Sequence, residues 1–154
     1  MRIISAIILA SVSLTGTAHA GPGEDFSSWA ADLQQEARER ASDSARRAAA
    51  PADPLDIEDP FYFELEQFSV DALRLSRSLA ENDGPQDLQC IFRGISADAA
   101  ARVEALHEAE SAGDQAHIYA ALADLMRDAA EIAPAIDDTS IEVEIERPHR
   151  CSNG

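Results

Sequence analysis

The segment GISAD, residues 94–98, comes nearest to a catalytic motif in this chain. Gly94-x-Ser96 matches the first half of the Gly-x-Ser-x-Gly turn that exposes the nucleophile of α/β-hydrolases, but Asp98 stands where the second glycine is needed. That motif joins a strand to a helix, whereas helix-forming residues flank this segment on both sides. We therefore interpret Gly94 as the end of one helix and Ser96 as the N-cap of the next, and predict no catalytic residues.

Two residue pairs have the spacing of metal ligands on a helix. Glu104-x-x-His107 matches the helical unit of di-iron carboxylate bundles, and Asp114-x-x-His117 follows downstream. Such centres need two units that face each other in mid-bundle, together with further glutamates, but these pairs flank an expected helix turn at Gly113. We predict no metal site and no cofactor. A metal-binding protein that uses these four residues is the alternative function.

The composition excludes several function classes. The chain has 29 acidic residues against 12 basic ones, a formal net charge of −17, and every basic residue is an arginine. Without lysine there is no Schiff-base chemistry and no phosphate-loop lysine. The negative field repels nucleic acid and anionic lipid, so we expect neither as a partner. A basic protein or a second copy of the chain is the expected partner.

The first twenty residues have the pattern of a secretory signal peptide. Arg2 precedes an apolar run from Ile3 to Leu14, and the segment ends in the small-x-small triplet Ala18-His19-Ala20. The apolar run is shorter than the ~20 residues that span a bilayer. We expect cleavage before Gly21 and export of the product to the periplasm or the extracellular medium.

The two cysteines, Cys90 and Cys151, favour a disulfide in an exported protein. Cys90 falls on the side of a short helix opposite Leu88 and Phe92, which predicts an outward side chain. The bridge would close a loop of about 61 residues and stabilise the fold by roughly 4 kcal/mol. The alternative, a redox pair, lacks the Cys-x-x-Cys spacing.

Apolar spacing and helix-end signals predict a small all-α bundle of four to five helices. The first helix is expected to pack through Trp29 and Leu33, while its second half is polar and projects. A short helix ends at Gly94, and Asp114 is expected to cap the last helix, whose apolar stripe is Ile118, Leu122, Leu125, Ala129 and Ile132. The expected helices cover residues 26–48, 60–82, 86–93, 96–112 and 114–133.

The helix at residues 60–82 has the most regular pattern, with Asp59 as its N-cap and Pro60 in its first turn. Its core stripe is Phe61, Leu65, Phe68, Ala72, Leu75 and Leu79. A second apolar strip, on roughly the opposite side, consists of Tyr62, Phe63, Val70 and Leu73. This strip indicates either a central helix covered on both sides or a surface that contacts a partner.

The chain divides into a signal peptide (1–20), an N-terminal amphipathic helix (21–50), a Pro/Asp-rich linker (51–60) and a helical core with a disulfide-tethered tail (61–154). The tail is extended because the segment IEVEIE, residues 141–146, alternates as a half-buried strand does. One core is expected for a mature chain of this length.

The segment CIFRGISAD, residues 90–98, resembles the helix joint of some periplasmic immunity proteins, over fewer than a tenth of the chain. The resemblance implies an inhibitor-type protein that binds a toxin. Periplasmic acid-stress chaperones are also small, exported, acidic and helical. The absence of a convergent catalytic set, the negative field and the second apolar strip predict a non-catalytic exported protein that acts by binding another protein, with the strip of residues 62, 63, 70 and 73 as the contact surface.

Overall fold

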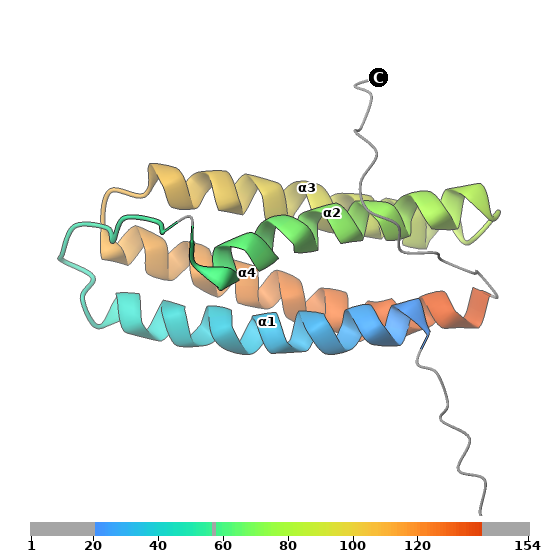
Figure 1. The fold of residues 1–154 in the computed structure, drawn as a ribbon, viewed down its shortest axis with the longest axis horizontal. Coiled ribbons are helices and arrows are strands. Elements are labelled where there is room, and N and C mark those ends of the chain that lie inside the picture. Colours follow the sequence, from blue (N-terminus) through green and yellow to red (C-terminus); the bar gives the residue numbers. More distant parts are fainter. Residues whose placement is uncertain (1–20, 57, 140–154) are drawn as a thin grey trace, which may run out of the picture.

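The computed structural model describes residues 21–56 and 58–139, and all of its regular elements are helical. These elements are α1 (Pro22–Ala45), α2 (Pro60–Glu81), α3 (Gln86–Glu108), α4 (Ala112–Ile132) and the 3₁₀ helix η1 (Ala133–Thr139). Consecutive α-helices run antiparallel, so the described chain forms an up-and-down bundle (Figure 1). The predicted all-α bundle is confirmed. The strand predicted at residues 141–146 lies outside the described residues.

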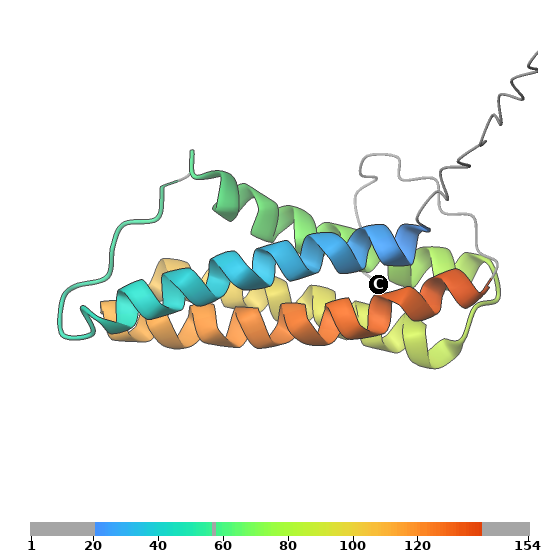
Figure 2. The same cartoon turned by 90° about the horizontal axis from the view of Figure 1, so that it is seen from below.

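The bundle consists of two closely packed helix pairs. Helix α1 packs mainly against α4, and α2 packs mainly against α3, as the two views show (Figures 1 and 2). Ala30 and Ala37 of α1 are fully buried, and such small side chains allow the axis of α4 to come close. Within the described residues, no helix is long and apolar enough to cross a membrane.

The prediction that the second half of α1 projects from the bundle is wrong. Ala37 is fully buried, and Ser44, in the last turn of α1, is only 4% exposed. The prediction rested on the polar composition of this half. Small side chains such as alanine and serine can nevertheless fill a close contact between helices, where leucine would be too large. Helix α1 therefore belongs to the core along its whole length.

An aromatic cluster joins three of the helices. Phe26 of α1 stacks on Phe68 of α2 with ring centroids 5.2 Å apart, and it meets the edge of Phe92 of α3 at 5.9 Å. Trp29 lies 5.9 Å from both Phe26 and Phe68. Phe68 and Phe92 have no exposed surface, so these rings contribute both buried apolar area and favourable ring geometry to the core.

Helix α2 agrees with its predicted pattern. All six residues of the predicted core stripe are buried, and Asp59 caps the helix by accepting a hydrogen bond from the Phe61 amide at 3.0 Å. Ser76 is also buried, and its hydroxyl donates to the Gln89 carbonyl of α3 at 2.7 Å. This bond satisfies a polar group inside the helix pair.

Helix α3 is continuous, so the predicted joint at Gly94 and Ser96 is wrong. Gly94 lies in the middle of the helix on its exposed side, where it ends nothing. Ser96 is 7% exposed and caps no helix, while its carbonyl accepts a hydrogen bond from the Ser69 hydroxyl of α2 at 3.0 Å. Burial of Phe92 and Ile95 on either side of Gly94 outweighs the intrinsic cost of a helical glycine, about 1 kcal/mol.

Helix α4 differs from its prediction in its cap and in its buried face. Ser111 is the N-cap, and Asp114 occupies the third helical position in a reciprocal capping box with it. The buried side chains of α4 are Ala112, Gln115, Tyr119, Leu122, Ala123, Met126 and Ala129. Ile118, Leu125 and Ile132 of the predicted stripe are only half-buried. Helix α4 packs mainly against α1, and the face that it buries carries Tyr119 and Met126 instead.

The segment between α1 and α2 is bound to the turn between α3 and α4. The Ala52 amide donates to the Glu110 carbonyl at 3.1 Å, and the Ala112 amide donates to the Ala50 carbonyl at 3.0 Å. These bonds pair the backbones in the manner of a short antiparallel bridge between Pro51 and Ser111. The expected linker therefore does not separate α1 from the rest of the bundle.

Candidate functional site

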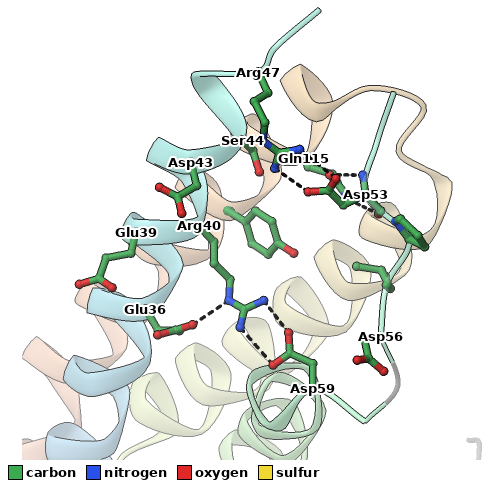
Figure 3. Close-up of a pocket in the computed structure, with 13 residues that line it drawn as sticks. Glu36, Glu39, Arg40, Asp43, Ser44, Arg47, Asp53, Asp56, Asp59 and Gln115 are labelled. Atoms are coloured by element: carbon green, nitrogen blue, oxygen red, sulfur yellow. Dashed lines mark hydrogen bonds and ion pairs between the residues drawn. The ribbon is translucent and has the colours of Figure 1, made fainter. Parts of the chain in front are cut away.

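A surface pocket lies between the second half of α1, the segment that leads to α2, and the first turns of α4 (Figure 3). Its volume is about 360 Å³. Glu36, Arg40 and Ser44 follow one another at four-residue intervals along α1, which places them on one wall. Gln115 and Tyr119 of α4 have the same spacing and form the opposite wall.

Arg40 binds two of the carboxylates that line this pocket. Its guanidinium donates two hydrogen bonds to the Asp59 carboxylate, at 2.6 and 3.1 Å, and its Nε donates to Glu36 at 2.8 Å (Figure 3). The same group lies 4.4 Å from the centre of the Phe61 ring, as in a cation–π contact. Because Asp59 caps α2, this arginine fixes the start of α2 against α1.

The Asp59 carboxylate is stabilised in its charged form. Partial burial acts to raise its pKa, but the hydrogen bonds from Arg40 and from the Phe61 amide, with the charge of Arg40, outweigh burial and lower the pKa. Asp59 therefore remains ionised over the neutral range, and its ion pair with Arg40 persists there.

Gln115 holds the opposite end of the pocket. This side chain is 2% exposed, and its amide makes two hydrogen bonds to the backbone of Asp53, accepting from the N–H at 2.9 Å and donating to the carbonyl at 2.7 Å. The Asp53 carboxylate in turn binds the Arg47 guanidinium at 2.9 and 2.5 Å, which lowers the pKa of that carboxyl. The pocket walls are thus held by interactions from three segments of the chain.

Tyr119 is the largest buried polar side chain of the pocket. It is 7% exposed, and its ring lies 6.2 Å from that of Phe61. Burial raises the pKa of its hydroxyl, while the nearby Arg40 acts in the opposite direction. The phenol is therefore neutral at physiological pH, so it can both accept and donate a hydrogen bond.

The pocket is strongly acidic. Its carboxylates are Glu36, Glu39, Asp43, Asp53, Asp56 and Asp59. They outnumber the two arginines that line it, and both arginines are already ion-paired. The arrangement suits a cation, since an anion would meet unbalanced negative charge.

The structure divides the predicted strip of α2 into two parts. Tyr62 and Leu73 are half-buried, and the Tyr62 ring lies 5.3 Å from that of His107, edge to face. Phe63 is 64% exposed and Val70 is 37% exposed. Phe63 and Val70 are thus the predicted contact residues that lie open to solvent, and we call them the α2 apolar edge.

The four metal candidates do not come together. His107 of α3 makes a hydrogen bond through its Nε2 to the Tyr62 hydroxyl, and the Asp114 carboxylate is engaged by Ser111 in the capping box. Glu104 and His117 are exposed on α3 and α4. Between residues 21 and 139, Ile57 apart, no three His, Cys, Asp or Glu side chains form a group that could hold a metal ion.

Cys90 is exposed on α3, as predicted from its position opposite Phe92. The Arg93 guanidinium approaches its sulfur at 3.5 Å. Its expected disulfide partner, Cys151, lies outside the described residues.

Comparison of the chain with protein-family models, curated proteins and solved structures gives no match. The function must therefore be argued from the side chains themselves.

Sequence reasoning missed the pocket. Glu36 and Arg40 have the spacing of a helical ion pair, and Asp59 is recognisable as a cap. Neither signal indicates that Arg40 binds Asp59, 19 residues away, or that Gln115 binds Asp53, 62 residues away. Gln115 has no local sequence signal at all.

Proposed function

We propose that this chain is an exported, non-catalytic protein that binds another protein of net positive charge. The observation that carries this proposal is the exposure of Phe63 within a chain whose net charge is −17. A large aromatic side chain that is mostly exposed is a common anchor of protein interfaces. The surrounding negative field would speed encounter with a basic partner and repel acidic proteins.

The α2 apolar edge has the geometry of a small contact surface. Val70 follows Phe63 by seven residues, so both side chains lie on the same face of α2, away from the buried stripe. Glu66, exposed and one turn from Phe63, adds negative charge beside the apolar contact. This combination suits a partner surface with an apolar pocket and a basic rim.

We propose a non-catalytic protein because the segment nearest to a catalytic motif, residues 94–98, lacks an accessible nucleophile. Ser96 is buried inside a continuous helix, and Asp98, two residues further along the helix, pairs with Arg102. A nucleophile needs access to substrate and a base within hydrogen-bond reach, and Ser96 has an inaccessible side chain.

Export and a Cys90–Cys151 disulfide are part of the proposed function. Cys90 is exposed, so a thiol reagent will modify it unless it is bonded. We expect no reactive thiol in the unreduced exported protein and two after reduction and unfolding. Two reactive thiols before reduction would exclude the disulfide.

Photo-crosslinking in cells that naturally express the protein tests the proposed binding. A benzoylphenylalanine at position 63 should give a discrete cross-linked product with a protein of net positive charge, and its yield should fall in 0.5 M salt, where the Debye length is only about 4 Å. The same residue at Ala101, exposed on α3, is the matched control and should give none. Equal products from both positions, no product from position 63, or a product with a second copy of the chain would each overturn the basic-partner proposal.

A further inference from the structure

We propose that residues 140–154, the segment that follows η1, bind across the outer face of α2 on their way to Cys90 of α3. The surface that receives the segment, which we call the α2 outer face, consists of Leu73, Arg74 and Arg77. This inference goes beyond the proposed function, because it assigns a contact within the chain itself and does not depend on the basic partner.

The described chain ends close to this surface. Helix η1 ends at Thr139, and its Asp137 binds the start of α1. The start of α1, the turn between α2 and α3, and the end of α4 lie at the same end of the bundle (Figures 1 and 2). Cys90 is only about 6 Å along the helix axis from the first residue of α3. Cys151 follows Thr139 by twelve residues, which span up to about 40 Å when extended, enough to cross two helices.

Arg74 supplies the observation that points to a cover over the α2 outer face. It lies on the side of α2 that is nearly opposite the buried stripe, yet its side chain is only 19% exposed. Its Nη1 donates to Asp71 at 2.6 Å, whereas its Nη2 is buried and has no hydrogen-bond partner among the described residues. A buried N–H without an acceptor is unfavourable, so a carboxylate from residues 140–154 would stabilise this guanidinium.

The charges of the segment complement the α2 outer face. Arg77 follows Arg74 by three residues, is exposed, and belongs to no ion pair in the part of the chain that the structure describes. The segment carries three carboxylates at alternate positions, on Glu142, Glu144 and Glu146. Attraction between these groups would hold the segment on one of the few basic surfaces of an acidic chain.

The other face of the segment is apolar. Ile141, Val143 and Ile145 alternate with the glutamates, so an extended segment presents all three side chains on one side. Leu73 is half-buried, and part of its side chain is therefore available for contact with them. The glutamates then point outward, where the long side chains of the neighbouring arginines can reach them along the apolar surface.

Methyl NMR of the complete, oxidised exported protein tests this contact. Nuclear Overhauser effects should join the methyl groups of Leu73 to those of Ile141, Val143 or Ile145. A mixed sample of labelled and unlabelled chains shows whether the contacts form within one chain. The absence of such contacts, or contacts only between two copies of the chain, would overturn the proposal.

Cleavage by a glutamate-specific protease tests the charges. Arg74→Gln with Arg77→Gln should raise the rate of cleavage within residues 142–146 about tenfold, because each ion pair at a partly exposed site contributes modestly to docking. Arg38→Gln with Arg46→Gln removes the same charge from exposed positions and should change the rate less than twofold. Mass spectrometry identifies the cleaved bonds. Equal rates in the two double variants would exclude the arginine contacts.

The outcomes separate this inference from the proposed function. Phe63 lies ten residues from Leu73, about 15 Å along α2, so the docked segment leaves it exposed. If the contacts to Leu73 are absent while cross-linking through position 63 succeeds, only the docking fails. If the contacts are present and position 63 gives no product, the proposed function fails and the docking stands. If thiol counting excludes the disulfide, the contacts to Leu73 still decide the question.

Discussion

Asp137 and Gly23 lie 114 residues apart in the sequence, and a hydrogen bond of 2.9 Å joins the Gly23 amide to the Asp137 carboxylate. The other oxygen of the same carboxylate accepts from the Glu24 amide at 2.8 Å. Gly21, the N-cap residue of α1, has no side chain that could make these bonds. The start of α1 is therefore capped by η1, from the other end of the described chain. The negative charge of the Asp137 carboxylate also interacts favourably with the positive end of the α1 dipole.

Replacing Asp137 should destabilise the bundle at this joint. Asp137→Ala leaves two helix N–H groups without their acceptor, and loss of such a cap costs about 1 kcal/mol of unfolding free energy. Urea denaturation followed by circular dichroism measures the change. Asp138→Ala, at the exposed neighbouring position, is the control. It should change the free energy of unfolding by less than about 0.5 kcal/mol, as is usual for surface sites. Equal effects of the two changes would exclude the capping role.

Gly94→Ala should stabilise the protein. Beyond the neighbouring residues and the local backbone of α3, a methyl group at this position meets no atom within 4 Å, and the backbone is helical on both sides. Alanine is favoured over glycine inside a helix by about 1 kcal/mol, so we expect the free energy of unfolding to rise by about 0.5 to 1 kcal/mol. Thermal and urea denaturation test this. A loss of stability would indicate that the helix is interrupted at Gly94, as the sequence predicted.

Gly23→Ala should have the opposite effect. A methyl group at this position would overlap the Ala133 carbonyl oxygen and would lie 3.0 Å from the Asp137 carboxylate. Because the first of these is backbone, α1 must move away from η1, at a cost of about 2 kcal/mol. The same denaturation experiments measure it, with Gly94→Ala as the matched change. An unchanged midpoint would show that this contact can relax without cost.

Asp59→Asn should remove part of the pH dependence of stability. The pKa of Asp59 is lowered in the folded protein, so its contribution is present above the unfolded value of about 3.9 and is lost as the pH falls through the folded value. At pH 7 the variant should be less stable by about 1 kcal/mol, since it keeps a capping oxygen but loses the charge that faces Arg40.

The measurement for Asp59 is the urea midpoint of both proteins between pH 7 and pH 2. The difference should shrink steadily below about pH 4. Asp87→Asn, at an exposed position on α3, serves as the control. A difference that stays constant down to pH 2 would show that the charge of Asp59 contributes nothing.

Gln115→Glu should destabilise the pocket wall. A carboxylate can accept the Asp53 N–H but cannot donate to the Asp53 carbonyl, and it would place a charge at a position that is only 2% exposed. We expect a loss of about 2 kcal/mol. Hydrogen exchange of the Asp53 amide should also accelerate, whereas Gln86→Glu, exposed at the start of α3, should change neither quantity. Unchanged protection of Asp53 would exclude this clamp.

The helices that were predicted well have signals within a few residues. Asp59, Pro60 and the buried stripe of α2 act through local capping and through one helical face, so their pattern is readable in the linear chain. The buried face of helix α4 was not predicted correctly from the local pattern. Two apolar stripes lie side by side on it, and its contact with α1 determines that Tyr119 and Met126 are buried while Ile118 and Leu125 remain half-exposed.

The sequence by itself determined the helical class, the negative field and most helix ends, because periodicity, charge and capping depend on composition or on neighbours within one turn. Only the tertiary structure decided that α3 runs through Gly94, that Asp137 caps α1, and that Gln115 joins Asp53 to make a pocket. Each of these depends on which helices pack together. Packing places residues separated by up to 114 positions within hydrogen-bond distance, and no local pattern encodes that arrangement.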